Sequence, residues 1–229
     1  MNFDIKNYGV IRIGGMELWI TETMVNTWII MGVLIVLAIA ARIKLKNFKE
    51  VPKGFQNVLE FLVETFDNYF RSSAREELMY LGSWFFTIFA FVLISNISGV
   101  WNMRAPTADW SFTLAIALVT FFMTQILAVR YRKGEYLKSF LDPIFIFLPV
   151  NIIGEIARPI SLSFRLFGNM LGGLVMMTLI YEVTPIFAHY FIPAALHIYF
   201  DLFAGVLQTY IFCTLSLSFI NNTSLSPDV

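Results

Sequence analysis

The sequence predicts an all-α polytopic membrane protein, with about five membrane-crossing helices and one amphipathic helix at the membrane surface. Hydrophobic residues make up 58% of the 229 residues and charged residues only 14%, with a mean hydropathy of +0.71. A soluble domain is usually about 45–50% apolar and about 25% charged. Three runs of 19, 26 and 20 residues contain no Asp, Glu, Lys or Arg. A helix needs about 20 mostly apolar residues to cross a bilayer, so each run can supply a span.

The same composition excludes several classes of protein. High hydropathy without net charge excludes disorder, and a soluble chain of this size cannot bury so much apolar surface. Sixteen basic and sixteen acidic residues balance, so nucleic acid is not an expected partner. The single Cys213 cannot form an internal disulfide. Neither a phosphate-binding loop nor a zinc-ligand pattern occurs, so no nucleotide, metal or other cofactor is expected.

The first three spans are predicted at 23–43, 77–101 and 110–130. The first span is read as a retained helix rather than a signal peptide, because residues 1–22 are net negative and the basic residues follow the apolar run. Between the first two spans, residues 54–75 place apolar side chains at helical spacing on one face. This segment is too polar to cross and should lie at the cytoplasmic interface. Its excess of acidic residues leaves two alternatives open, docking against a partner protein and simple lipid contact.

The last two helices are predicted at 143–182 and 186–221, with Pro185 in the turn between them. The helical parts of this hairpin, read as 151–182 and 186–221, are long for membrane helices, about 48–54 Å at 1.5 Å per residue. The hydrocarbon core is only about 30 Å thick, so the hairpin must tilt, kink or protrude. Pro159 and Pro193 are the expected kink points.

Loop lysines and arginines predict the orientation. The loop between the second and third spans contains one basic residue, Arg104, whose charge Asp109 balances. Two other loops are strongly basic. Both basic loops are expected in the cytoplasm, which puts the N-terminus outside and the C-terminus inside. With no internal repeat or long linker, 1–229 is predicted to be a single membrane domain. The basic loops contain Arg42, Lys44, Lys46, Lys49 and Lys53 after the first span, and Arg130, Arg132, Lys133 and Lys138 after the third.

Arg165 lies within a long apolar helix, where an arginine costs about 2.5–3.5 kcal/mol to insert at mid-bilayer. Ser161, Gly168 and Gly172 share its helical face, and such small residues let another helix approach closely. The face therefore presents a permanent cation, which can repel cations or stabilise an approaching carboxylate. The alternative is an arginine that snorkels to the surface or pairs internally.

Other polar residues of the last two helices suggest an ion path. His197 and Asp201 lie one turn apart and suit a proton relay, or alternatively a buried pair that holds the hairpin. Gln208 continues the same polar stripe, which should face protein or water rather than lipid. Glu155 and Glu182 lie about 15 Å and about 25 Å from Arg165 along a straight helix, one toward each membrane surface.

These residues carry a resemblance to a known family. Residues 158–170, which read RPISLSFRLFGNM, resemble the signature of subunit a of F-type ATP synthases of the bacterial type. Residues 200–212 resemble the last helix of that family, and the stretch from 106 to 115 is also similar to it. The resemblance covers nearly the whole chain.

The resemblance implies a non-catalytic stator subunit in the cell inner membrane, beside a rotating ring of c subunits and subunit b of the peripheral stalk. Two offset half-channels would pass H⁺ or Na⁺ to and from the ring. Arg165 would face the ring's carboxylate, with Asn169, Gln208 and Asn96 as polar residues of the path. Asp201 stands where other members carry histidine or glutamate, which suggests a titratable role.

This sequence also departs from the family pattern. Leu174 and Asn151 stand where members of the family carry glutamate, so His197 with Asp201, or Glu155, is expected to substitute. A secondary transporter is an alternative that uses the same buried charges, but transporters usually show paired repeats. An intramembrane hydrolase built on His197 and Asp201 is a third reading, and it lacks a nucleophile motif.

Overall fold

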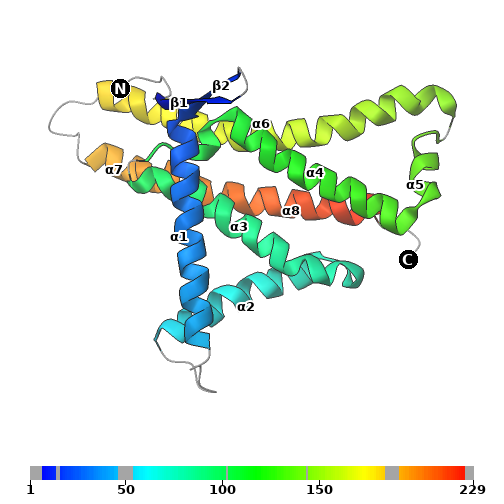
Figure 1. The fold of residues 1–229 in the computed structure, drawn as a ribbon, viewed down its shortest axis with the longest axis horizontal. Coiled ribbons are helices and arrows are strands. Elements are labelled where there is room, and N and C mark those ends of the chain that lie inside the picture. Colours follow the sequence, from blue (N-terminus) through cyan, green and yellow to red (C-terminus); the bar gives the residue numbers. More distant parts are fainter. Residues whose placement is uncertain are drawn as a thin grey trace. The chain divides into compact units, whose positions relative to one another are not determined.

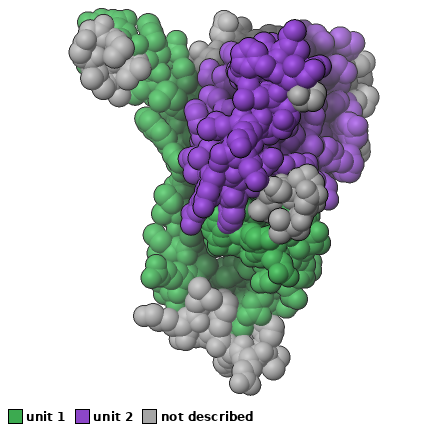
Figure 2. Space-filling model, turned by 90° about the vertical axis from the view of Figure 1, so that its right-hand side faces the viewer, with its two compact units in different colours: residues 1–95 green, residues 96–229 purple. Residues whose placement is uncertain are grey.

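The computed structural model, drawn in Figure 1, describes residues 7–13, 16–45, 54–101, 103–142, 144–183 and 191–224. Contacts within the chain divide it into two compact units, residues 1–95 and 96–229, which Figure 2 colours separately. The single membrane domain expected from the sequence stays a prediction.

Five helices in the described ranges are long and apolar enough to cross a membrane. Each coincides with one of the predicted spans, which confirms an all-α polytopic membrane protein. The helices cover Glu22–Lys44, Glu76–Trp101, Trp110–Arg132, Phe145–Val183 and Ala195–Ser224.

Unit 1 begins with a small β-hairpin that the sequence analysis did not predict. Strand β1 (Asn7–Ile13) pairs antiparallel with β2 (Met16–Thr21), and Ile13 is paired with Met16 in the register. The sequence did contain a hairpin signal, because two glycines separate two short apolar runs. Helix α1 (Glu22–Leu45) follows β2 directly.

The predicted amphipathic segment forms helix α2 (Phe55–Ser73). After it come the short 3-10 helix η1 (Glu76–Leu81) and helix α3 (Gly82–Ile97). Two buried rings fasten α2 to α3: Phe66 lies 5.1 Å from Phe86 and Phe70 lies 5.4 Å from Phe85, measured between ring centroids. Aromatic pairs at this separation add to the energy of burial. The membrane-surface position of α2 stays a prediction.

Unit 2 is built on three long helices that run side by side in Figure 1: α4 (Trp110–Arg132), α6 (Leu148–Val183) and α8 (Ala204–Ser224). Asp109 caps α4, since its side chain accepts a 3.0 Å hydrogen bond from the Ser111 backbone N–H. Small polar side chains bring the helices close, as where the hydroxyls of Thr113 and Ser163 meet at 3.2 Å. Shorter elements join the long ones: η2 (Ser98–Trp101), η3 (Pro106–Ala108), α5 (Gly134–Ser139) and η4 (Phe145–Phe147).

The last predicted helix has an irregularity that the sequence did not reveal. It is described from α7 (Phe191–His197), through the π-helix η5 (Ile198–Phe203), into α8. A π-helix widens the turn and changes which side chains share a face. Of the two expected kink points, Pro159 lies inside the continuous helix α6. In the last predicted helix the α geometry changes at residues 198–203, after Pro193. The predicted turn at Pro185, together with residues 186–190, lies outside the described residues.

Candidate functional site

Arg165 lies on the exposed side of α6. Ser161, Gly168 and Gly172 are exposed on the same helix, and a Cβ added to either glycine would meet no other atom within 4 Å. Across the described ranges, no hydrogen bond or ion pair reaches Arg165. The described residues therefore leave this face open, with one cation among small residues.

A polar pair joins α6 to α8 one turn beyond Arg165. The Nδ2 atom of Asn169 donates a 2.5 Å hydrogen bond to Oε1 of Gln208. Gln208 is only 1% exposed, and its Nε2 has no partner among the described residues. A buried N–H without a partner costs about 1–3 kcal/mol, so natural proteins keep few of them. The pair links the exposed Asn169 of α6 to a buried amide of α8.

Asn96 connects the end of α3 to α8. It is 1% exposed, and its Nδ2 donates to the carbonyl oxygen of Gly205 at 3.1 Å and to the hydroxyl of Thr209 at 2.9 Å. A Cβ on Gly205 would lie 3.2 Å from Cβ of Asn96, so the two segments touch at the backbone of Gly205. Asn96 thus has a clear packing role in this structure. Its partner Thr209 is the next residue after Gln208 in the sequence.

His197 stands at the centre of a three-residue hydrogen-bonded chain. Its Nδ1 lies 2.5 Å from Oδ2 of Asp201, and its Nε2 lies 3.0 Å from the hydroxyl of Tyr181 on α6. A neutral imidazole can donate to the carboxylate and accept from the phenol, whereas the protonated ring donates to both. Both hydrogen bonds of His197 are therefore compatible with either form of the imidazole, and neither form requires the heavy atoms to move.

Tyr181 was missed by the sequence analysis. A tyrosine near the end of an apolar helix is typical of an interfacial anchor, so nothing marked it as a partner of His197. Its neighbour Glu182 is exposed near the end of α6, and no hydrogen bond or ion pair reaches it from the described residues. The structure brings together Tyr181, His197 and Asp201, and leaves Glu182 apart from them.

Asp201 packs directly against the backbone of Gly99. A Cβ on Gly99 would lie 2.9 Å from Cγ of Asp201 and 3.1 Å from both carboxylate oxygens. Only glycine leaves room for the carboxyl group in its present position. Gly99 is the second residue that the sequence analysis did not assign to the site.

At the other end of α6, Glu155 belongs to a separate polar cluster. Its Oε1 pairs with Nη1 of Arg158 at 2.9 Å, and its Oε2 accepts a 3.3 Å hydrogen bond from Gln125. The hydroxyl of Tyr136 donates to Oε1 of the same glutamine. Burial raises the pKa of Tyr136 above its ordinary value, and the charge of Glu155 raises it further.

This cluster borders a polar cavity of about 220 Å³ where the ends of α4, α6 and α8 meet α5. Asn151 donates to the backbone carbonyls of Phe140 at 2.9 Å and Asp142 at 3.2 Å. Asn151 thus holds the loop that contains Phe140 and Asp142 against the start of α6. Glu155 is the carboxylate that lines the cavity. The cavity is lined by Arg132, Tyr136, Ser139, Phe140, Asn151, Glu155, Arg158, Asn222 and Thr223.

Comparison with known families shows to which protein family the chain belongs. The family model described as ATP synthase A chain matches residues 24–221, most of the chain. The chain belongs to the ATP synthase subunit a family. As a member with five helices that can cross a membrane, it is a multi-pass membrane subunit of the ATP synthase.

Individual relatives share about a third of their residues with this chain. A subunit a from Propionigenium modestum, described as sodium ion specific, is 33% identical over 227 residues, covering 89% of this chain and 74% of the relative. A second, named ATP synthase subunit a 2, from Bradyrhizobium sp., is 36% identical over 208 residues, covering 88% and 87%. The ATP synthase subunit a of Moorella thermoacetica is 32% identical over 206 residues, covering 89% and 90%.

Most site residues expected from the sequence fall into three places, and Glu182 stands apart from them. Arg165 stands on the open face, with Asn169 and Gln208 one turn away and Asn96 hydrogen-bonded to α8. His197 and Asp201 form a second place, and Glu155, toward the start of α6, forms the third. In the described ranges, no group of three or more His, Cys, Asp or Glu side chains is placed to hold a metal ion.

Proposed function

We propose that this chain is the non-catalytic ion-translocating stator subunit a of an F-type ATP synthase. It passes H⁺ or Na⁺ through two half-channels, to and from a rotating ring of c subunits. The observation that carries the proposal is the open face of α6, where Arg165 has no described partner and Gly168 and Gly172 leave room for another helix. A cation at membrane depth costs free energy, and because no described residue pairs with it, a partner outside the chain explains it best.

The proposed mechanism at Arg165 is electrostatic. A guanidinium does not deprotonate in proteins, so Arg165 carries no proton itself. It stabilises the ionised form of a carboxyl group that a neighbouring helix brings opposite it. The same fixed charge repels free cations and keeps the two half-channels separate.

Two clusters are proposed to serve the two sides of the membrane. Tyr181, His197 and Asp201, with Glu182 nearby in sequence, would serve the outer side. Glu155 with its polar cavity would serve the cytoplasmic side, since the predicted topology puts the C-terminal end of α8 there. Asn169, Gln208 and Asn96 would line the polar route beside Arg165.

The proposal also names partners and location. The c ring lies opposite the face of Arg165, subunit b of the peripheral stalk binds elsewhere on the chain, and lipid surrounds the remaining apolar surface. The complex lies in the cell inner membrane with the N-terminus of this chain outside. This subunit binds no nucleotide and forms no covalent bond, since passing ions along its charged and titratable side chains requires neither.

The test is Arg165→Ala in the complete complex, reconstituted in vesicles. ATP-driven ion pumping and ion-driven ATP synthesis should be abolished, and a passive ion leak should appear, while the c ring still co-purifies. Arg71→Ala is the matched control, because Arg71 is exposed on α2 and, among the described residues, pairs with Asp67 alone, at 2.6 Å. Normal ATP-driven pumping by Arg165→Ala would refute the proposal.

A further inference from the structure

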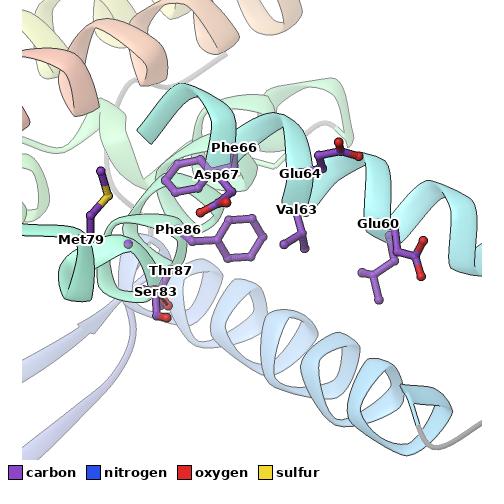
Figure 3. A pocket seen from close by; sticks show the side chains of 11 residues that line it. Glu60, Val63, Glu64, Phe66, Asp67, Met79, Ser83, Phe86 and Thr87 are labelled. Atoms are coloured by element: carbon purple, nitrogen blue, oxygen red, sulfur yellow. Dashed lines mark hydrogen bonds between the residues drawn. The ribbon is translucent and has the colours of Figure 1, made fainter. Parts of the chain in front are cut away.

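Unit 1 carries a large groove that no residue of the proposed ion path touches. It lies between α2 on one side and η1 with the start of α3 on the other, and has a volume of about 800 Å³ (Figure 3). It is lined by Leu59, Glu60, Val63, Glu64, Phe66, Asp67, Met79, Gly82, Ser83, Phe86 and Thr87.

The groove exists because α2 is fastened to α3 only through part of its length. Phe66 and Phe70 are buried against α3, whereas apolar side chains nearer the start of α2 stay exposed. Val63 and Leu62 are 47% and 55% exposed, and both belong to this uncovered half. An apolar patch of this kind beside a groove usually marks an interaction surface. The uncovered residues are Phe55, Val58, Phe61, Leu62 and Val63.

The groove is negatively charged on its α2 side. Glu60, Glu64 and Asp67 line it at i, i+4 and i+7, and among the described residues no Lys, Arg or His lines it. Figure 3 shows the carboxyl groups along one helix, with Val63 between Glu60 and Asp67 and the Phe66 ring next to Asp67. Glu64 has no partner among the described residues, whereas Glu60 accepts from Gln56 and Asp67 pairs with Arg71.

We propose that this groove binds a helix of a partner protein that is apolar on one face and basic along one edge of that face. Helices present side chains at i, i+4 and i+7 along about 10 Å of their length. Three lysines or arginines at that spacing match the three carboxylates, while the apolar face covers Val63, Phe66 and Phe86. The inference stands apart from the proposed function, because it uses none of the ion-path residues.

Charge favours a basic helix over two other possible occupants, the lipid headgroups and a second copy of this chain. The cytoplasmic leaflet that the predicted topology places beside α2 carries anionic headgroups, which the three carboxylates repel. The α2 helix of a second copy would set carboxylates against carboxylates, which is also unfavourable. A basic amphipathic helix satisfies both the apolar wall and the charged edge.

The test uses the full-length chain, purified without other subunits, in nanodiscs of zwitterionic phosphatidylcholine. The probe is a synthetic 18-residue helical peptide with leucines on one face and lysines at i, i+4 and i+7 beside them. A matched peptide carries glutamates in place of the lysines. Fluorescence anisotropy should show at least about tenfold tighter binding of the lysine peptide.

Two variants locate the binding in the groove. Glu60→Gln with Glu64→Gln should weaken binding of the lysine peptide by about tenfold, and Val63→Trp, which puts a bulky ring on the apolar wall of the groove, should weaken it by at least as much. Glu76→Gln with Glu135→Gln is the control, since both acids are exposed outside the lining. Circular dichroism verifies that each variant keeps its helical content.

Three results would overturn the inference. Equal binding of both peptides would show that charge does not select the occupant. Unchanged binding by the Val63→Trp variant would place the peptide elsewhere. Absence of peptide binding, together with phospholipid that native mass spectrometry detects on the wild type and not on Val63→Trp, would assign the groove to lipid.

Discussion

The carboxylate of Asp201 lies 2.5 Å from Nδ1 of His197, one turn away on the same helix. Both side chains are partly exposed, at 19% for Asp201 and 34% for His197. A short contact between two titratable groups, with access to solvent, lets a proton move between them without a large rearrangement. The same contact would also stabilise the helix if no proton moved, so the two roles need separate tests.

Asp201→Asn separates these roles. The amide keeps a hydrogen bond to His197 but cannot carry a charge, so ion transport should fall by about tenfold or more while the complex still assembles. The measurement is ATP-driven pumping in vesicles between about pH 6 and about pH 9. Asp142→Asn, an exposed loop carboxylate, is the control. Normal pumping across that range would leave Asp201 as a structural hydrogen-bond partner only.

Gly99→Ala tests the position of Asp201 without changing its charge. The added methyl would lie 2.9 Å from Cγ of Asp201, closer than real Cβ atoms approach, so the carboxyl group must move. A flexible side chain can move at small cost, and we expect normal assembly with a loss of pumping similar to that of Asp201→Asn.

The matched control for this prediction is Gly154→Ala, on α6, where a Cβ would meet nothing within 4 Å. It should pump normally, since alanine is also the better helix former. Normal pumping by Gly99→Ala would show that the present position of the Asp201 carboxyl group is not needed for transport.

The contrast between Gly99 and the spans shows what the sequence can and cannot predict. Apolar runs predicted all five spans, because the bilayer imposes length and hydropathy on each helix separately. The contact between Gly99 and Asp201 joins segments about a hundred residues apart, and local periodicity carries no information on such contacts. The same holds for Tyr181 and His197, which meet only through the packing of two helices.

The π-helix η5 is a second example of what the sequence did not reveal. Residues 198–203 read as an ordinary apolar stretch around one aspartate, and no glycine or proline within them marks the change of helix type. A wider turn is tolerated where tertiary contacts offset its poorer local geometry. By contrast, the exposed face of Arg165 was predictable, because Ser161, Gly168 and Gly172 follow the α-helical period of α6.

The pKa of Tyr136 leads to a prediction on stability at high pH. Burial raises this pKa above 10.0, and the nearby Glu155 charge raises it further. The folded chain therefore holds the phenolic proton more tightly than the unfolded chain. This contribution to stability is present below about pH 10 and is lost as the pH rises through the folded pKa.

Thermal midpoints of wild type and Tyr136→Phe, measured at one scan rate, test this prediction. The advantage of wild type over the variant should shrink above about pH 10. Tyr199→Phe, at a tyrosine that is 55% exposed, is the control and should show no such trend. A wild-type advantage that stays constant with pH would mean that the phenol titrates alike in both states.

The predicted orientation is tested by labelling a single cysteine at position 60, in a Cys213→Ser background. The basic loops that flank the spans place α2 on the cytoplasmic face, so a membrane-impermeant maleimide should label Glu60→Cys in inverted vesicles and not in intact cells. A cysteine at position 8, in the N-terminal hairpin, should show the opposite pattern. Labelling of position 60 only from outside would reverse the topology.

Arg165→Lys addresses what the open face of α6 requires besides charge. Lysine keeps a positive charge, but it lacks the planar fork that can contact both oxygens of a carboxylate. A lysine at membrane depth also deprotonates more readily than arginine, because burial disfavours the charged form. Both effects weaken the hold on a carboxylate from a neighbouring helix, so pumping should fall below about one-tenth of the wild-type rate.

The pH dependence of the Arg165→Lys variant distinguishes the two causes. If loss of the proton is the defect, lowering the pH should restore much of the pumping, because the substituted lysine becomes charged again. If the fork geometry is the defect, the rate should stay low at every pH, since protonation does not create a second donor plane. Full pumping at neutral pH would mean that any fixed cation suffices. The open face of α6 would then act by charge alone.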